Sequence, residues 1–209
     1  MKPYDKLKRL MDIVMATVFV IVFSPIYIVT AFLIWKEDHH SPIYSHLRVG
    51  RNKKPFNFYK FRSMHINADA MLQTNKEIYE QVRSGNNKIK NDPRITKIGK
   101  FIRKYSIDEF PQMYNVLKGD MSFIGPRALR PDEFALYEER DPKNKAKMEV
   151  ITTVNPGITG YWQVNGRSDI DFDSRMDMDV FYAKNYSLGL DLKILISTPL
   201  AVIQAKGSY

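Results

Sequence analysis

The longest apolar run of the chain lies close to its N-terminus. Residues 13–35 include no charged side chain. As a helix, this run would extend over about 35 Å, which is enough to cross the hydrocarbon core of a membrane. It is too long for a signal peptide, and no small-residue cleavage site follows it. The pattern therefore predicts a membrane helix.

Ser24-Pro25 lies in the middle of this run. Proline removes one helical hydrogen bond and kinks a helix. Lysines and arginines flank both ends of the run, so the positive-inside rule identifies no outside end. Two topologies fit this pattern: a kinked, re-entrant helix that enters and leaves by the cytoplasmic face, and a bitopic span with a tolerated proline.

The rest of the pattern predicts a mainly helical α+β fold with one small β-hairpin. Two apolar-rich runs, 42–49 and 55–64, flank a basic, turn-rich link, which is typical of a hairpin. Surface helices are expected over 67–84 and 131–147. We expect two parts, which are a membrane helix-break-helix at 1–36 and a cytoplasmic or interfacial catalytic domain at 37–209.

Two further segments are amphipathic or apolar helices in this interpretation. Residues 95–104 alternate apolar and basic positions, which suits a helix in the membrane interface or the solvated face of an ordinary helix. Residues 190–205 read as a helix that is interrupted near Pro199 and packs on the core or on the membrane.

The strongest local pattern lies in residues 106–127. Pro111 is tolerated only in a first helical turn, so a helix is expected to begin at Ile107 or Asp108 and to end at Gly119. Asp108 and Glu109 then lie at the helix N-terminus. The apolar face at i, i+3, i+4 and i+7 is formed by Phe110, Met113, Tyr114 and Leu117.

Acidic side chains in a first turn have a purely structural interpretation, as cap and dipole partner. The flanking cations favour another one. Arg103 precedes the two acids and Arg127 follows them, and a helix N-terminus among cations is suited to phosphate. Within such a site, one carboxylate can attack phosphorus while the other holds a divalent metal.

Composition narrows the classes of partner. The chain has 209 residues, 44% hydrophobic content and a formal charge of +9, which indicates an ordered domain with an anionic partner. Nucleic acid, anionic lipid and a nucleotide-sugar all qualify. The absence of cysteine excludes disulfides and thiol chemistry, and the four histidines show no metal-binding spacing.

The segment SIDEFPQMYNVLKGDMSFIGPR resembles the hallmark motif of the small monotopic phosphoglycosyl transferases, also called bacterial sugar transferases. The resemblance implies that Asp108 is a nucleophile that takes a sugar-1-phosphate from a UDP-sugar. It also implies that Glu109 is associated with Mg²⁺. These enzymes are described as having a re-entrant helix broken at a Ser-Pro pair, so the resemblance favours re-entry at Ser24-Pro25.

Other blocks of the chain resemble the same family. The YKFRSM block makes Lys60 and Arg62 candidate phosphate contacts, together with Arg103 and Arg127. A PGITG–QVNGR block is implied to lie near the nucleotide-sugar, and Asp179 in DVFYAKN matches an acidic position of the family. The candidate residues for binding the nucleotide-sugar are therefore Gln163, Asn165, Arg167 and Asp179.

The chain departs from the family pattern at two positions. Ala128 stands where many members have a second proline, which could loosen the loop that aims Arg127. Asn155 replaces a frequent basic residue before Pro-Gly, which weakens the case for a phosphate contact at this position. Larger members carry further transmembrane helices and an upstream domain, so this chain resembles the minimal catalytic form.

The resemblance implies an enzyme that transfers sugar-1-phosphate to undecaprenyl phosphate, releases UMP and initiates surface polysaccharide synthesis. It favours UDP-galactose or UDP-glucose as donor, Mg²⁺ as cofactor and membrane lipid as a partner, with no nucleic acid. It leaves a homodimer open. The expected location is the cytoplasmic face of the bacterial inner membrane.

Two alternatives remain from the residues. Asp-x-Asp pairs at 169–173 and 177–179 suit a membrane-anchored glycosyltransferase that would release UDP. The basic composition suits a non-enzymatic module that binds anionic lipid or RNA, whose affinity would fall with added salt. The nucleotide that is released separates these three readings.

Overall fold

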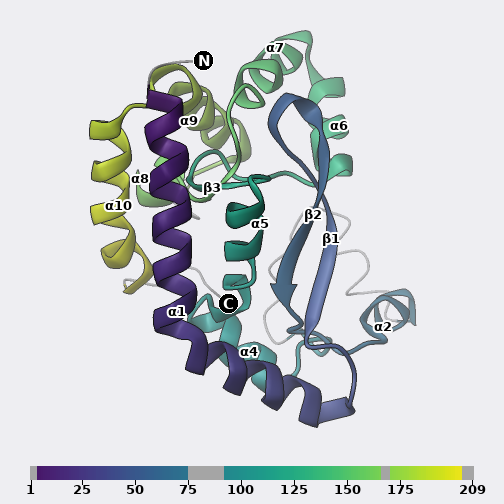
Figure 1. The fold of residues 1–209 in the computed structure, drawn as a ribbon. Coiled ribbons are helices and arrows are strands. Elements are labelled where there is room, and N and C mark those ends of the chain that lie inside the picture. The colour runs from purple at the N-terminus through teal and green to yellow at the C-terminus, as the bar shows by residue number, and fades with distance from the viewer. Residues whose placement is uncertain (1–3, 75–91, 166–169, 204–209) are drawn as a thin grey trace.

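The computed structural model describes residues 4–74, 92–165 and 170–203, and it confirms the mainly helical α+β class (Figure 1). Among these residues, strands form two small two-stranded sheets. The elements, in chain order, are α1 (Tyr4–Asp38), β1 (Ile43–Val49), η1 (Arg51–Lys53), β2 (Pro55–Phe61), α2 (Ala68–Thr74), α4 (Lys97–Lys104), η2 (Ile107–Glu109), α5 (Gln112–Lys118), β3 (Ser122–Ile124), α6 (Pro131–Arg140), α7 (Pro142–Ile151), β4 (Gly157–Thr159), α8 (Tyr161–Asn165), α9 (Phe172–Asn185) and α10 (Leu188–Ile203).

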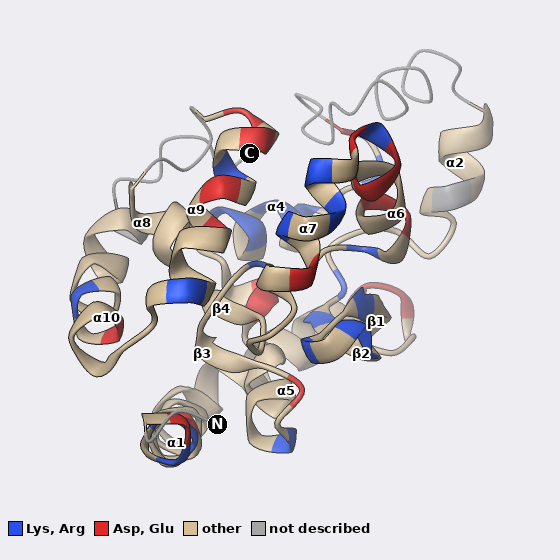
Figure 2. Ribbon diagram, turned by 90° about the horizontal axis from the view of Figure 1, so that it is seen from above, with Lys and Arg blue, Asp and Glu red and all other residues tan. Residues whose placement is uncertain are grey.

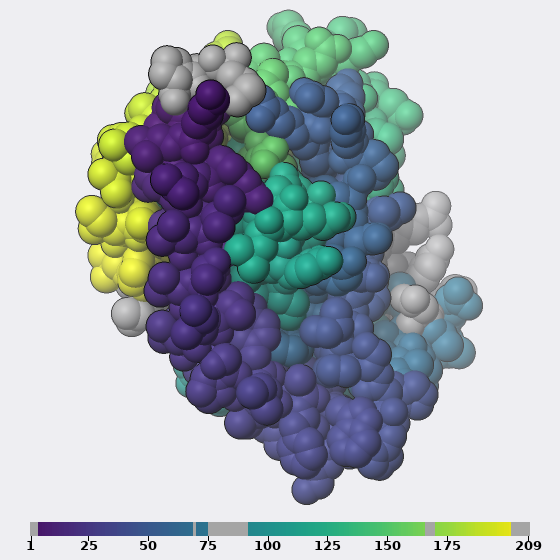
Figure 3. All heavy atoms as spheres, viewed as in Figure 1, coloured from purple at the N-terminus to yellow at the C-terminus, as the bar shows by residue number. Residues whose placement is uncertain are grey.

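Helix α1 is the one helix of the described residues that is long and apolar enough to cross a membrane. It continues through Pro25, although proline leaves the Ile21 carbonyl without its helical donor. The Ser24 hydroxyl donates to that carbonyl at 2.8 Å and compensates for the loss. The axis of α1 changes direction along its length (Figure 1). Figure 3 shows the helix on the face toward the viewer, beside α10 in yellow, and its apolar side chains are largely exposed.

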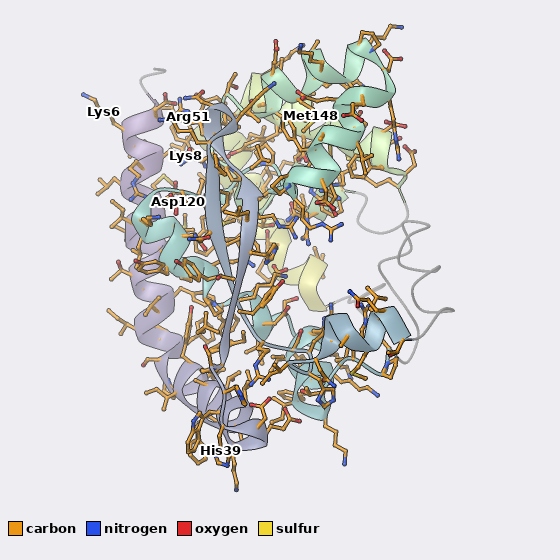
Figure 4. All side chains as sticks on the ribbon, turned by 90° about the vertical axis from the view of Figure 1, so that its right-hand side faces the viewer. Lys6, Lys8, His39, Arg51, Asp120 and Met148 are labelled. Atoms are coloured by element: carbon orange, nitrogen blue, oxygen red, sulfur yellow. The ribbon has the colours of Figure 1, made fainter. Side chains whose placement is uncertain are left out.

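Polar contacts fasten both ends of α1 to the rest of the chain. At the first end, Arg9 donates to the carbonyls of Val116 and Leu117, which end α5. At the other end, Asp38 forms an ion pair with Arg62, just after β2. Lys6 and Lys8 mark the first end in Figure 4, and His39 marks the other. Viewed from above, α1 lies between α10 and α5 (Figure 2).

The predicted β-hairpin is confirmed. Strands β1 and β2 pair antiparallel, with Tyr44 opposite Lys60 and Val49 opposite Pro55. The hairpin runs from the end marked by His39 to the turn marked by Arg51 (Figure 4). Successive side chains of a strand point to opposite faces. One face, which we call the cationic face, therefore carries Tyr44, His46, Arg48, Phe56, Phe58 and Lys60.

A short parallel pair, β3 with β4, joins two distant motifs. Gly157 N–H donates to the Pro126 carbonyl at 2.7 Å, and Gly125 N–H donates to the Thr159 carbonyl at 2.9 Å. A Cβ on Gly157 would lie 2.0 Å from the Gly125 nitrogen, so glycine is required at this approach. The Gly-Pro-Arg loop and the Pro-Gly-Ile-Thr-Gly block are consequently neighbours.

Several helix predictions are refined by the structure. The segment at 131–147 forms two helices, because Asp141-Pro142 ends α6 and begins α7 with an Asp141 N-cap on Lys143 N–H at 2.8 Å. The helix expected over 67–84 is described only as α2, and its remainder lies outside the described residues. The expected interruption near Pro199 is wrong: α10 is continuous, since its packing, with Ile194 in a buried cluster, outweighs the lost hydrogen bond.

Candidate active site

The acidic pair lies on a tight turn, η2, rather than in the first turn of α5. Ser106 has φ 55° and ψ 22°, in the left-handed region, and its carbonyl accepts from Glu109 N–H at 3.2 Å. Strained backbone of this kind persists where the surroundings fix it, often at functional sites. The prediction that the acids lie at the entrance of a helix is correct in position. The turn before Pro111 is of the 3-10 type because α5 itself begins only at Gln112.

Lys60 joins the two carboxylates. Its Nζ lies 2.8 Å from Glu109 Oε1 and 3.6 Å from Asp108 Oδ2. Burial raises the pKa of Asp108, and Lys60 opposes that shift. Burial acts on Glu109 as well, but Lys60 and Arg127 outweigh it and lower the pKa of Glu109. The site therefore holds one firmly ionised carboxylate beside a second, poorly hydrated one.

Arg127 supplies a further positive charge to this site. It follows β3, in a loop that lies along β1, where Val49 N–H donates to the Leu129 carbonyl at 2.9 Å. No carboxylate in the described parts of the chain forms an ion pair with Arg127. Arg103, in the last turn of α4, also lowers the pKa of Asp108. Two of the predicted cations thus act on the acidic pair together with Lys60.

Other cations near Arg127 were missed by the sequence analysis. Arg48 donates to the Ala128 carbonyl at 3.0 Å and pairs with Glu133 at 3.3 Å. Burial and Arg127 lower the pKa of Arg48 to about 10. Arg175 lies over the Trp162 ring, 4.5 Å from its centroid. A signal for Arg48 existed, because strand alternation places it on the same face as Lys60. No comparable signal pointed to Arg175.

Some predicted residues are engaged elsewhere. Arg62 pairs with Asp38 and donates to the Ser41 carbonyl at 3.0 Å, so it fastens α1. Gln163 donates to the Ile158 carbonyl at 3.1 Å, and Asn165 donates to the Tyr161 carbonyl at 2.7 Å. Arg167 lies outside the described residues. The sequence did not show that these side chains make local hydrogen bonds.

Asp179 is almost completely buried on α9, with 1% of its surface exposed. Burial raises the pKa of Asp179 to about 7, although Arg175 and Arg127 oppose the shift. This carboxylate therefore lies behind the cations of the site, within electrostatic reach of Arg127 and away from solvent.

The acidic pair provides suitable donors for a magnesium ion. Mg²⁺ is usually bound by one or two carboxylates together with substrate phosphates and water. Glu109 is an ionised carboxylate that fits this donor set. Elsewhere in the described ranges, no three acidic or histidine side chains gather into a cage.

An apolar groove of about 490 Å³ lies on the other face of β2 from Lys60, between that strand, α1 and α5. Its lining includes Val20 and Tyr27 of α1, Tyr59 of β2 and Pro111 of the segment before α5. The Tyr27 hydroxyl donates to the Phe110 carbonyl and so ties α1 to that segment. The volume and lining suit a hydrocarbon chain.

Comparison with known proteins gives one consistent result. The family model described as bacterial sugar transferase matches residues 3–205. An uncharacterized sugar transferase of Haemophilus influenzae is 45% identical over 207 residues, which are 97% of this chain and 42% of that protein. An undecaprenyl-phosphate galactose phosphotransferase of Salmonella typhimurium is 42% identical over 206 residues, which cover 97% of this chain and 42% of that protein. The exopolysaccharide production protein ExoY of Sinorhizobium fredii is 37% identical over 206 residues, which cover 97% of this chain and 88% of that protein.

The chain thus spans less than half of the first two relatives and most of the third. The match extends over the membrane helix, the acidic pair and the two loop blocks that β3 and β4 bring together. This chain belongs to the bacterial sugar transferase family.

Proposed function

We propose that this chain is a phosphoglycosyl transferase, which moves a sugar-1-phosphate from a UDP-sugar to undecaprenyl phosphate, releases UMP and initiates a surface polysaccharide. The observation that carries the proposal is the position of Lys60 between Asp108 and Glu109, at 3.6 and 2.8 Å. A cation that joins a desolvated carboxylate and an ionised one suits phosphoryl transfer to a carboxylate nucleophile.

The first step is an attack by a carboxylate oxygen of Asp108 on the β-phosphorus of the donor. A new oxygen–phosphorus bond forms, and the bond between the β-phosphorus and the bridging oxygen breaks. UMP leaves with that oxygen, and the sugar phosphate remains on Asp108 as an acyl phosphate. Burial favours this role, since a poorly hydrated carboxylate has less solvent to lose when it attacks.

In the second step, a phosphate oxygen of undecaprenyl phosphate attacks the same phosphorus. The acyl phosphate bond breaks, Asp108 returns to its carboxylate form, and the product is an undecaprenyl diphosphate sugar. Lys60 and Arg127 stabilise the charge on the non-bridging oxygens in both steps, and Arg103 adds to the positive field. Mg²⁺, held by Glu109, would neutralise the charge of the diphosphate.

A membrane location follows from the acceptor and from α1. We propose that residues 1–36 form a re-entrant helix kinked at Ser24-Pro25, and that residues 37–209 form the catalytic domain at the cytoplasmic face of the inner membrane. The contacts of Arg9 with α5 and of Asp38 with Arg62 support this topology, because one domain holds both ends of the apolar run. The adjacent apolar groove suits the hydrocarbon chain of a lipid substrate.

The Salmonella relative is named as a galactose phosphotransferase, which supports a hexose donor, and UDP-galactose or UDP-glucose is the donor we propose. The Asp-x-Asp alternative gains little support. Asp171 caps α9, Asp177 pairs with Lys147 and Asp179 is buried. Each of these carboxylates therefore has a structural explanation that does not involve a metal ion. Asp169 lies outside the described residues.

Capture of the intermediate tests the proposal. Protein incubated with Mg²⁺ and a UDP-hexose labelled in the β-phosphate, without acceptor, is expected to become labelled on the peptide that contains Asp108. Addition of undecaprenyl phosphate should remove the label. Asp108→Asn should remain folded and unlabelled. Full turnover by Asp108→Asn, or a label that stays on another residue, would contradict the assignment.

A further inference from the structure

An aromatic and imidazole pair shares the cationic face with Lys60 and has no role in the mechanism so far. Tyr44 is opposite Lys60 in the hairpin, on the cationic face, and Lys60 contacts Asp108. The ring of Tyr44 stacks on that of His46, with centroids 5.4 Å apart and planes at 28°. Tyr44 is 53% exposed, so the cationic face presents an open aromatic surface at the register position of Lys60.

His46 contributes a hydrogen-bond donor with a defined position. Arg48 Nε donates to His46 Nε2 at 2.7 Å. Because a guanidinium only donates, Nε2 is the acceptor, and the proton of the neutral ring lies on Nδ1. Burial, followed by Arg48 and Lys60, lowers the pKa of His46 to about 4 and keeps the ring neutral. The buried Nδ1 has no hydrogen-bond partner among the residues that the structure describes. Buried donors of this kind usually have one, so Nδ1–H calls for a ligand.

The pair packs against the Phe58 ring. The Phe58 ring lies 5.2 Å from the His46 ring, and both Arg48 and Lys60 lie over Phe58, at 5.3 and 5.6 Å from its centroid. The cations would therefore bind the charged phosphate, and Tyr44 and His46 would contact a neutral ring that carries hydroxyl groups. Aromatic surface combined with a fixed polar group is typical of a specific small-molecule site.

We propose that Tyr44 and His46 form the sugar subsite, in which the apolar face of a hexose ring lies on the aromatic pair and a sugar hydroxyl oxygen accepts from His46 Nδ1–H. The inference rests on the proposed function, because it takes Asp108 as the group that receives the sugar phosphate. The sugar is bonded to the phosphorus that Asp108 attacks, and so it stays near Lys60, whereas the uridine departs with the other phosphate.

The test compares donors and variants. We would measure kcat/KM for UMP release from UDP-galactose, UDP-glucose and UDP-N-acetylgalactosamine with the wild type, Tyr44→Ala, His46→Ala and His46→Gln. Leu47→Ala is the matched control, because Leu47 is 53% exposed on the opposite face of the same hairpin. Inhibition by UMP, which lacks the sugar, is measured in parallel.

For the preferred hexose, Tyr44→Ala and His46→Ala are expected to lower kcat/KM about 10- to 100-fold and to reduce discrimination between the two hexoses. His46→Gln, which keeps a donor, should retain more activity. Inhibition by UMP should stay within about twofold of the control. Equal behaviour of all variants and Leu47→Ala would overturn the inference, as would a parallel loss of UMP inhibition, which would place the nucleotide on this surface. Absence of UMP release by the wild type from every donor would overturn the proposed function and this inference with it.

Discussion

At the scale of single residues, the site depends on how Lys60 divides its charge between two acids. Glu109 receives the shorter contact and is the more strongly ionised, whereas burial dominates at Asp108. Neighbouring carboxylates with different surroundings commonly take different chemical roles. The roles that we propose, with Asp108 as nucleophile and Glu109 as metal ligand, use this difference.

Lys60→Met should lower kcat about 10²- to 10³-fold, because the variant loses a cation that stabilises charge on the transferred phosphate. Steady-state UMP release measures the effect. Lys118→Met is a suitable control, since Lys118 is a half-exposed surface lysine paired with Asp120. Equal activity of the two variants would remove Lys60 from the mechanism.

The pH dependence of kcat/KM should show an acid limb above the ordinary aspartate value of about 4. Asp108 must be ionised to attack, and burial raises its pKa, so activity is lost as the pH falls through that raised value. In Lys60→Met, the limb should move to higher pH because a lowering influence is gone. A rate that stays constant down to pH 4 in the wild type would contradict the role of Asp108.

At the scale of elements, the sequence predicted the parts whose signals are local. The alternating runs around the basic turn predicted the hairpin, and Pro111 placed the acids at a helix entrance. The positions of Arg48 and Arg175 relative to Arg127 depend on tertiary packing, which a single sequence does not display. The continuity of α10 through Pro199 was also missed, because packing outweighed a local breaker signal.

The re-entrant topology that we propose for α1 predicts how its two ends can be labelled. The chain has no cysteine, so Lys6→Cys and Glu37→Cys each introduce a unique thiol at an exposed position. A membrane-impermeant maleimide should modify both in inside-out vesicles and neither in intact spheroplasts. Glu139→Cys, in the catalytic domain, marks the cytoplasmic side. Labelling of Lys6→Cys in spheroplasts would indicate a bitopic span.

At the scale of the whole molecule, a buried polar network connects α1 with α9 and α10. Asp191 of α10 is 1% exposed and accepts from Lys8, Tyr4 and Tyr182, each at 2.7 Å. Tyr182 also donates to the carbonyl of Ile124 at 3.1 Å, next to the Gly-Pro-Arg loop. The network therefore connects α1 with the strand that precedes Arg127.

Asp191→Ala should destabilise the protein by about 3 to 5 kcal/mol, because it leaves Lys8 partly buried without its partner. Thermal unfolding in detergent would measure the change. Asp132→Ala is the control, since the Asp132 side chain is 62% exposed and its removal should change stability by no more than about 0.5 kcal/mol. Equal unfolding temperatures for the two variants would contradict the coupling of α1 to the domain.

The identity of the released nucleotide tests the central claim most directly. Detergent-solubilised protein would be incubated with Mg²⁺, undecaprenyl phosphate and UDP-galactose or UDP-glucose, and the nucleotide product would be identified by chromatography. The proposed chemistry breaks the diphosphate and predicts UMP, in a reaction that stops when Mg²⁺ is chelated. Release of UDP would mean cleavage at the sugar carbon and would contradict the account.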